Sequence, residues 1–439
     1  MADLSQSITH KRVLKVAGPI VLSNATVPLL GAVDVGVVGQ IGEAAPIAAV
    51  AMGGIILATV YWIFGFLRMG TAGMVGQAEG AGDSQEVSAL LTRALLIAGA
   101  GGLALITLQY VIFAGAFALA PVTSEVEALA RQYLTIRIWS APFAISVFAF
   151  TGWMVAMERT VGMFYVQLVM NGTNILLSVF FVLGLNLGVP GVAIATVIAE
   201  ILGAFFGLYL CRSAFENPAW RDWPRIFDRT RLVAMALISG DILVRSALLM
   251  AIFTSFVFAG ARFGTVTLAA NEVLIQFMYI TAYAMDGFAF AAEALIARAV
   301  GRSDPRLVRR AAVMTSFWGG VTCVSMAVLF AVFGPMLIDV MAKSPEVQED
   351  ARRYLWWMIA APPLGCAAWM FDGIFIGATR GRDMRNMMIV SFIIYVVAVL
   401  IFLPTMGNHG LWLALNISFV ARGITLGLKY PALERSAAP

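Results

Sequence analysis

Long apolar runs recur along the whole chain, and they constrain its fold more than any other feature of the sequence. Of the 439 residues, 61% are hydrophobic and only 12% are charged, whereas soluble domains carry about 25% charged residues. Too few polar groups are present to cover the apolar ones in water. The composition therefore excludes a soluble enzyme, a secreted disulfide scaffold and a disordered chain, and it predicts an all-α polytopic membrane protein.

The apolar runs divide into twelve expected transmembrane helices, since each crossing needs about 20 predominantly apolar residues. Several runs are longer than a crossing requires, which predicts tilted helices or helices that extend past the bilayer. The expected spans cover residues 13–40, 47–78, 88–115, 127–157, 160–186, 189–212, 231–259, 265–298, 308–335, 350–379, 385–404 and 408–428.

The distribution of positive charge predicts the orientation of these spans. Alternate loops are rich in Lys and Arg, such as Lys11, Arg159, Arg225 and Arg309, whereas the other loops carry mainly acidic residues such as Glu125. Cytoplasmic loops of membrane proteins carry the excess of Lys and Arg. We therefore expect a multi-pass protein of the cell membrane with both termini in the cytoplasm.

A repeat with an offset of 221 residues relates the two halves of the chain. The segment EVEALARQYL at 125–134 resembles EVQEDARRYL at 346–355. The same offset relates identical residues elsewhere, namely Asp83 and Asp304, Pro142 and Pro363, Gly152 and Gly373, and Arg159 and Arg380. Because six spans in each copy give both copies the same orientation, the repeat predicts two parallel six-helix lobes with a transport site between them.

A polar stretch separates the two copies. Residues 213–230 contain Pro218, Pro224 and charges of both signs, which is typical of a connecting segment rather than of a span. We expect an N-lobe at 1–212, a cytoplasmic linker at 213–230 and a C-lobe at 231–439.

Asp34 is the first candidate functional residue. It lies in the first expected span, in LLGAVDVGVVGQ, with no cation within two turns along that helix. An ionised side chain in a bilayer costs at least about 2.5–3.5 kcal/mol on insertion scales. An isolated buried carboxylate favours uptake of a proton, and a cationic substrate or Na⁺ would also neutralise it. A purely structural role is the alternative.

Two asparagines mark the fifth expected span. Asn171 and Asn174 are three residues apart, which places them on one helical face. Their amides can form hydrogen bonds with a carboxylate or a ligand without adding charge. They can equally join two helices to one another.

The second half carries four carboxylates and one arginine inside expected spans. Asp241 and Arg245 are one turn apart, which allows an ion pair within one helix. Asp286 and Glu293 are seven residues apart and share a helical face, and Asp372 lies in the tenth span. We interpret these groups either as a proton or cation relay or as a buried ion-pair network that holds the lobe together.

Several functions have no support in the sequence. It contains no Walker motif for ATP and no paired nucleophile and base, and its three cysteines and two histidines have no metal-ligand spacing. A net charge of +4 is explained by arginine-rich loops rather than by nucleic-acid binding. We expect no cofactor and no certain metal site. The expected partners are small organic molecules and membrane lipid, and the expected state is a monomer.

Four segments resemble the multidrug and toxic compound extrusion (MATE) transporters, and most closely the DNA-damage-inducible F (DinF) branch. They are FGFLRMGTAGMVGQAEGAGD, TAYAMDGFAFAAEA, FDGIFIGATRGRDMRN and GNHGLWLAL, and the resemblance covers nearly the whole chain. It implies two lobes of six helices and a central cavity. It also implies a secondary active transporter, not an enzyme, that exports organic compounds in exchange for H⁺ or Na⁺.

The resemblance also implies roles for particular residues. In DinF-like relatives the first-span carboxylate is the coupling residue, and Asp34 has that position. A fifth-span Asn followed four residues later by a carboxylate is common in the family, whereas here Asn174 is followed by Ser178. This departure favours proton coupling over a full Na⁺ site in the N-lobe. In the Na⁺-coupled NorM branch a tenth-span Asp joins a cation site; Asp372 matches it, but the seventh-span Glu is not evident, although Asp241 is nearby.

We therefore expect a proton-driven exporter of hydrophobic or cationic compounds that works by alternating access, with Asn171 and Asn174 tuning Asp34. The first alternative is an exporter of small aromatic or anionic metabolites, which an exposed Arg68 or Arg245 in the pocket would favour. A flippase for lipid-linked precursors is less favoured, because it would need a strongly cationic cavity and more than twelve spans.

Overall fold

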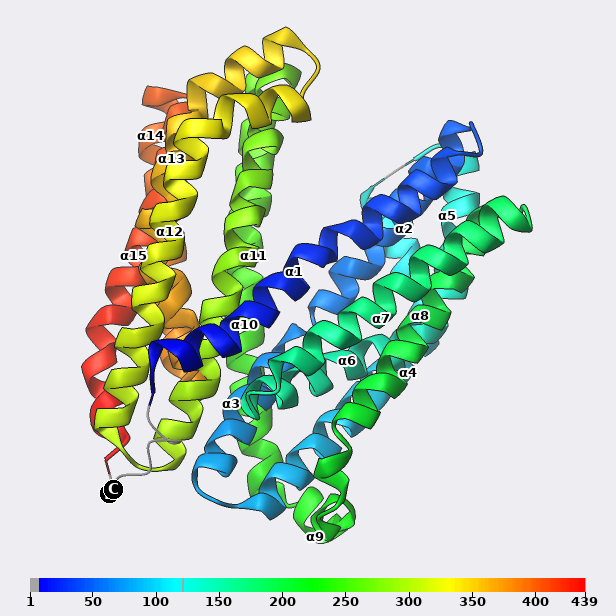
Figure 1. Ribbon diagram of the computed structural model, residues 1–439. Coiled ribbons are helices and arrows are strands. Elements are labelled where there is room, and N and C mark those ends of the chain that lie inside the picture. Colours follow the sequence, from blue (N-terminus) through cyan, green and yellow to red (C-terminus); the bar gives the residue numbers. More distant parts are fainter. Residues whose placement is uncertain (1–7, 121, 439) are drawn as a thin grey trace. The chain divides into compact units, whose positions relative to one another are not determined.

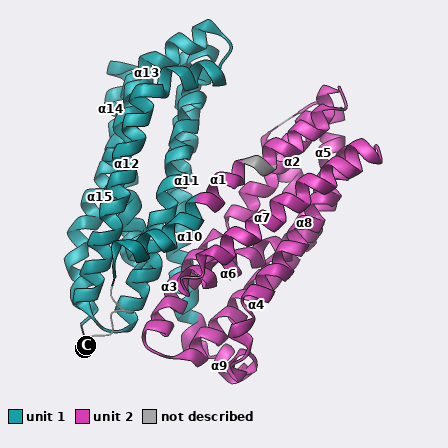
Figure 2. Cartoon of the chain, in the orientation of Figure 1, with its two compact units in different colours: residues 1–21, 233–439 teal, residues 22–232 magenta. Residues whose placement is uncertain are grey.

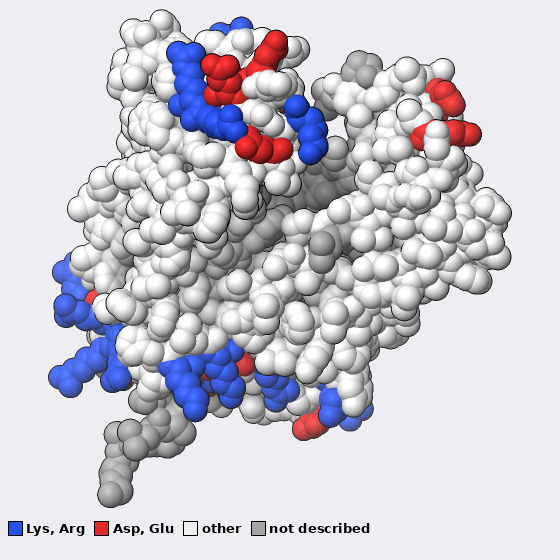
Figure 3. Space-filling view, turned by 45° about the horizontal axis from the view of Figure 1, so that its top comes forward, with Lys and Arg blue, Asp and Glu red and all other residues white. Residues whose placement is uncertain are grey.

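The fold of the described chain is entirely helical. The computed structural model describes residues 8–120 and 122–438, and every regular element in these ranges is a helix. Within these described ranges, twelve helical stretches are long and apolar enough to cross a membrane, which confirms the predicted all-α polytopic fold (Figure 1). On the face shown in Figure 3, Lys, Arg, Asp and Glu side chains gather in a few clusters, and large areas between these clusters are uncharged.

Eight main helices form the first half. They are α1 (His10–Gly39), α2 (Ala44–Trp62), α3 (Gly65–Gly80), α4 (Ser84–Leu119), α5 (Ser124–Arg137), α6 (Ala141–Ala156), α7 (Thr160–Val179) and α8 (Gly188–Leu210). Two of the six spans are broken helices, α2 with α3 and α5 with α6. In the second of these, Pro142 lies in the first turn of α6, where a missing backbone N–H removes no hydrogen bond that a new helix would make.

Six long helices form the second half. They are α10 (Arg229–Gly260), α11 (Thr265–Gly301), α12 (Pro305–Met341), α13 (Pro345–Gly377), α14 (Gly381–Met406) and α15 (Asn408–Ser436). The expected ninth and twelfth spans, which end at 335 and 428, are shorter than α12 and α15. Apolar residues mark only the part of a helix that crosses the bilayer, whereas its backbone hydrogen bonds continue into polar sequence.

The chain divides into two compact units (Figure 2). Unit 2 comprises residues 22–232, and unit 1 combines the chain before residue 22 with the chain after residue 232. The start of α1 belongs to unit 1 because it packs on α11, where a Cβ atom at Gly287 would lie 2.3 Å from a methyl group of Val21. The functional division into lobes at 1–212 and 231–439 stays a prediction.

The internal repeat is visible in the backbone. Gly82 has a positive φ of 77°, and Ser303, 221 residues later, has a φ of 55°. Glu158 and Thr379, at the same offset, have φ values of 55° and 52°. Left-handed backbone is uncommon for residues other than glycine. Its recurrence at one offset shows that both copies turn in the same way between equivalent helices.

The starts of equivalent helices repeat as well. Asp83 accepts a hydrogen bond from the backbone N–H of Glu86 at the start of α4, and Asp304 does the same for Leu307 at the start of α12. These are N-caps, which satisfy backbone donors that have no partner inside the helix.

A glycine contact recurs between the equivalent helices. A Cβ atom at Gly152 of α6 would lie 2.5 Å from the carbonyl oxygen of Arg68 in α3. At the same offset, a Cβ atom at Gly373 of α13 would lie 2.3 Å from the carbonyl oxygen of Ala289 in α11. Both distances are too short for any side chain, so glycine is what lets each pair of helices approach closely.

This contact leads to a stability prediction. Gly373→Val should push α13 away from α11 and lower the free energy of unfolding by about 1–3 kcal/mol, the usual cost of overpacking a close contact. Thermal unfolding of the purified protein in detergent would measure it. Gly320→Val on α12 is the matched control, because nothing lies within 4 Å of a Cβ atom there. Equal melting temperatures for the two variants would contradict the prediction.

Residues 213–230 are folded rather than extended. They contain the short helices η5 (Pro218–Arg221) and α9 (Trp223–Ile226), preceded by η4 (Arg212–Phe215). Thr92 of α4 donates a hydrogen bond to the carbonyl of Trp220 (3.0 Å). The buried Arg93 donates to the carbonyls of Arg225 and Ile226, both at 2.9 Å. The expected linker is therefore an integral part of unit 2.

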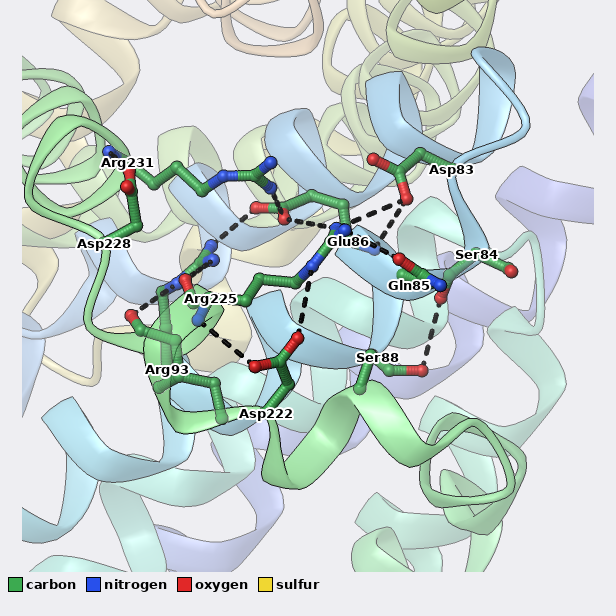
Figure 4. A network of polar contacts seen from close by, with 12 residues as sticks. Asp83, Ser84, Gln85, Glu86, Ser88, Arg93, Asp222, Arg225, Asp228 and Arg231 are labelled. Atoms are coloured by element: carbon green, nitrogen blue, oxygen red, sulfur yellow. Dashed lines mark hydrogen bonds and ion pairs between the residues drawn. The ribbon is translucent and has the colours of Figure 1, made fainter.

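Glu86 is the centre of an ionic network that joins the start of α4 to the connecting segment and to the start of α10 (Figure 4). Its carboxylate accepts from Arg93 at 2.6 Å and forms an ion pair with Arg231 at the start of α10. Arg225 lies 3.5 Å from the same carboxylate and donates to Gln85 at 2.6 Å. The start of α4 is thus covered by the connecting segment, and the charges around it compensate one another.

Candidate functional site

Asp34 lies in a buried cage of hydroxyl groups. Its side chain on α1 is almost fully buried, and its oxygens accept from Ser178 of α7 at 3.4 Å and from Thr196 of α8 at 3.5 Å. Asn174 donates to the Thr196 hydroxyl at 2.8 Å. The structure therefore brings together three predicted residues, Asp34, Asn174 and Ser178, and adds Thr196, which sequence reasoning missed.

The hydroxyl cage suits both protonation states of a carboxyl group. A hydroxyl can donate to a carboxylate and can accept from a carboxylic acid. The Thr196 hydroxyl also has a second acceptor, the carbonyl of Val192 at 3.0 Å. It can therefore turn away when Asp34 holds a proton of its own. The contacts to Asp34 are longer than ordinary O–H···O bonds, so neither state is locked.

Asn171 has a different position from Asn174. It accepts from Gln167 at 2.9 Å and donates to the carbonyl of Thr26 at 3.1 Å. This contact joins α7 to the backbone of α1 about two turns before Asp34. Among the two asparagines, only Asn174 belongs to the hydroxyl cage.

A buried ion pair adjoins the cage. Arg137 at the end of α5 lies 2.5 Å from Glu200 of α8, which is one turn after Thr196. Ser140 donates to the second oxygen of Glu200, and Arg137 also donates to the hydroxyl of Tyr133 at 2.8 Å. Sequence reasoning missed this pair, although an arginine inside the expected span 127–157 is itself a signal of function.

Two buried polar atoms beside this pair have no hydrogen-bond partner among the described residues. They are Oδ1 of Asn174 and Nε of Arg137. Buried polar groups in proteins are nearly always paired with protein or with ordered water. The cage and the ion pair thus offer partners for water molecules, which a proton needs in order to reach a buried carboxylate.

The charged residues of the second half pair between helices. Arg245 of α10 forms an ion pair with Asp372 of α13, and Arg422 of α15 lies 3.7 Å from the same carboxylate. Asp241 instead pairs with Arg385 of α14 at 2.6 Å. The ion pair within one helix that the spacing of Asp241 and Arg245 allowed is not formed. Arg385 and Arg422 were not anticipated.

Asp286 and Glu293 both lie on α11. Glu293 is buried and Asp286 is half-buried.

The surroundings of Asp372 bear on whether it could bind Na⁺. Its contacts are with Arg245 and Arg422, so two guanidinium groups neutralise this carboxylate. Their positive charge opposes binding of Na⁺ at Asp372. Among the described residues, no group of three or more His, Cys, Asp or Glu could hold a metal ion.

Unit 1 also contains an apolar cavity of about 500 Å³ between α10 and α14. Its walls include Phe258, Phe392 and Tyr395, together with the charged Arg262. Ser255 donates a hydrogen bond to the Tyr395 hydroxyl at 3.1 Å. Binding sites for organic molecules have this size and this mostly apolar lining.

Comparisons with known proteins agree with this architecture. The MatE family profile matches residues 19–180 and 242–401. DNA damage-inducible protein F of Escherichia coli (strain K12) is 35% identical over 97% of this chain and 92% of its own. A probable multidrug resistance protein NorM of Bradyrhizobium diazoefficiens is 28% identical over 96% of this chain and 93% of its own. The Vibrio cholerae MATE transporter VcmN in the bent form has the same fold, with a TM-score of 0.89 over 99% of both chains at 19% identity.

Proposed function

Since the chain belongs to the MatE family of membrane transporters, and is therefore a transporter and not an enzyme, we propose that it exports hydrophobic or cationic organic compounds in exchange for protons. The observation that carries the proposal is the burial of Asp34 among hydroxyl groups, with no cation of the described residues in an ion pair with it. A carboxylate that lacks an ion-pair partner in a medium of low dielectric is more stable when it holds a proton.

The transport cycle follows from two states of Asp34. As a carboxylate, Asp34 attracts a cationic compound. A proton that enters from outside converts it to a neutral carboxylic acid, whose O–H is donated to Ser178 or Thr196, and the attraction for the cation is lost. Release of that proton to the cytoplasm restores the carboxylate. Alternating access of the site to the two sides would couple the two movements.

Two observations favour H⁺ over Na⁺ as the coupling ion. Ser178 supplies a neutral hydroxyl beside Asp34, so the cage holds one carboxylate, whereas hard cations prefer several anionic or carbonyl oxygens. In the second half, Arg245 and Arg422 already neutralise Asp372. The same contacts argue against an anionic substrate at Arg245, because its charge is compensated by Asp372.

The ion pair of Arg137 and Glu200 would set how readily Asp34 accepts a proton. Arg137 adjoins the cage, because its partner Glu200 lies one turn after Thr196 on α8, and Glu200 compensates the positive charge of Arg137. Arg137 also donates to the hydroxyl of Tyr133 of α5 at 2.8 Å, and a tyrosine hydroxyl is uncharged near neutral pH. Arg137 and Glu200 are therefore positioning residues for Asp34.

This role leads to a pH prediction. Glu200→Gln should leave Arg137 uncompensated, which stabilises the Asp34 carboxylate, so proton uptake should require a lower pH. The pH midpoint of efflux should fall by about one unit, and Arg137→Gln combined with Glu200→Gln should restore it. Glu127→Gln is the control, because Glu127 pairs with Arg131 at the surface of the same helix, α5. A midpoint unchanged in Glu200→Gln would rule out this role.

The proposed function is tested with the purified protein in liposomes. A fluorescent organic cation such as ethidium is loaded, and its movement is followed under an imposed H⁺ gradient, an imposed Na⁺ gradient, or none. We expect transport with the H⁺ gradient alone. Transport driven only by Na⁺ would overturn proton coupling, and movement of anionic aromatic acids but not of cations would overturn the substrate class.

A further inference from the structure

A second cavity lies where α12 begins and α15 ends, both in unit 1. It has a volume of about 420 Å³, and its walls include Arg306, Arg309 and Arg310 together with Val313 and Met314 of α12. We call it the arginine cavity. One carboxylate, Glu434 of α15, also lines it. The arginines thus outnumber the carboxylate by three to one in the wall of one hollow.

The three arginines face a single carboxylate, Glu434, across the cavity. In the part of the chain that the structure describes, no ion pair within 4.0 Å and no side-chain hydrogen bond joins Arg306, Arg309 or Arg310 to another protein group. Neighbouring guanidinium groups repel one another unless solvent or an anion lies between them. The cavity therefore has the charge of a binding site for an anion.

The equivalent helix start in the other half of the repeat, that of α4, is covered by protein. The start of α4 corresponds to the start of α12 at the offset of 221 residues, and Asp83 and Asp304 cap the two helices alike. Around α4, however, Glu86 is paired with Arg93 and Arg231, and the folded segment 212–228 lies over it (Figure 4). At the start of α12, in contrast, Arg306, Arg309 and Arg310 are all exposed, so a group from outside the chain can reach them.

The face of α12 beyond the cavity indicates what kind of anion fits. Val313 is 61% exposed and Phe317 is 54% exposed, and Val321 and Val324 continue the same exposed stripe. Steps of three and four residues place this stripe on the helical face that also carries Arg310. Three cations are thus followed along one membrane helix by a continuous apolar track.

We propose that the arginine cavity binds the phosphate group of an anionic phospholipid, with an acyl chain along the exposed stripe of α12. Guanidinium groups bind phosphate oxygens through paired hydrogen bonds, and basic pockets at membrane surfaces hold anionic headgroups. The bilayer supplies this ligand at high local concentration. Inorganic phosphate shares the headgroup chemistry but has nothing to place on the apolar stripe.

Native mass spectrometry of the full-length protein in a neutral detergent tests the proposal. The probes are phosphatidylglycerol, phosphatidylcholine and inorganic phosphate. R306Q/R309Q/R310Q should bind phosphatidylglycerol at least about tenfold more weakly than the unmodified protein. Val313→Trp should also weaken binding, because it fills the cavity and keeps all three charges. The control R221Q/R229Q/R382Q removes three arginines that do not line the cavity and should bind normally.

Each outcome decides the proposal. Equal loss of binding in the control variant would show attraction by general surface charge, and full retention in Val313→Trp would show that the cavity is not the site. Equal binding of phosphatidylcholine, or displacement of phosphatidylglycerol by inorganic phosphate at similar concentration, would overturn the anionic lipid as ligand. A melting temperature for each variant shows whether it is folded, and Val313→Trp provides the test if the triple variant is not.

Discussion

Asp34→Asn should abolish efflux driven by a proton gradient. The asparagine has the shape of the carboxyl group and can form hydrogen bonds with Ser178 and Thr196, so the hydroxyl cage is kept. It cannot take up or release a proton. Without a proton to exchange, the H⁺ gradient has no means of driving the compound, so the initial rate in liposomes should be the same with and without the gradient.

Matched measurements separate coupling from misfolding. Glu43→Gln makes the same chemical change at an exposed carboxylate of unit 2 and should transport normally. Binding of the fluorescent cation to detergent-purified Asp34→Asn should be weaker, because the amide resembles the protonated acid and lacks the negative charge. If Asp34→Asn exported the compound down a pH gradient at the normal rate, Asp34 would not be the coupling residue.

Asp372→Asn should be the most destabilising single substitution among the charged residues of unit 1. It would leave Arg245 and Arg422 buried side by side without a counter-charge; their side chains are 8% and 4% exposed. Removal of one partner from a buried ion pair costs about 3–5 kcal/mol, because the remaining charge stays away from water. Thermal or denaturant unfolding of the purified protein would measure the loss.

The control for this substitution is an ion pair on the surface of the same unit. Asp339 and Arg352 are both 44% exposed, and exposed pairs contribute about 0–1 kcal/mol. Asp339→Asn should therefore leave stability almost unchanged. The comparison also decides between the two interpretations of the second-half carboxylates. A relay role predicts that Asp372→Asn alters the ion dependence of transport at normal stability. A structural role predicts that Asp372→Asn lowers stability and leaves the ion dependence of transport unchanged.

Much of the fold was predictable because its signals are local. A crossing helix needs a run of apolar residues, so hydropathy alone locates the twelve spans. The repeat was predictable because both copies place the same residue types at the same turns, and the positive φ angles at Gly82 and Ser303 follow this offset. Helix ends were less predictable: α15 continues to Ser436, well past the expected end at 428.

The partners of the charged residues were not predictable in the same way. The sequence places Asp241 and Arg245 one turn apart, yet each binds a group on another helix, Arg385 and Asp372 respectively. The ion pair of Arg137 and Glu200 joins residues 63 positions apart. Such contacts depend on how each helix is rotated about its axis and on which helix lies beside it. The spacing of residues along one helix determines neither of these.

The sequence by itself determined that this protein is a helical membrane protein with a repeated six-span unit, because hydropathy and helical turns depend on neighbouring residues. It also identified Asp34 as a candidate functional residue, because an ionisable side chain inside a membrane span costs free energy. Only the tertiary structure decided that Asp34 is surrounded by Ser178 and Thr196, and that Asp372 is neutralised by two arginines. The energy of a buried charge is set by the groups within a few ångströms of it, and packing of distant segments brings those groups together.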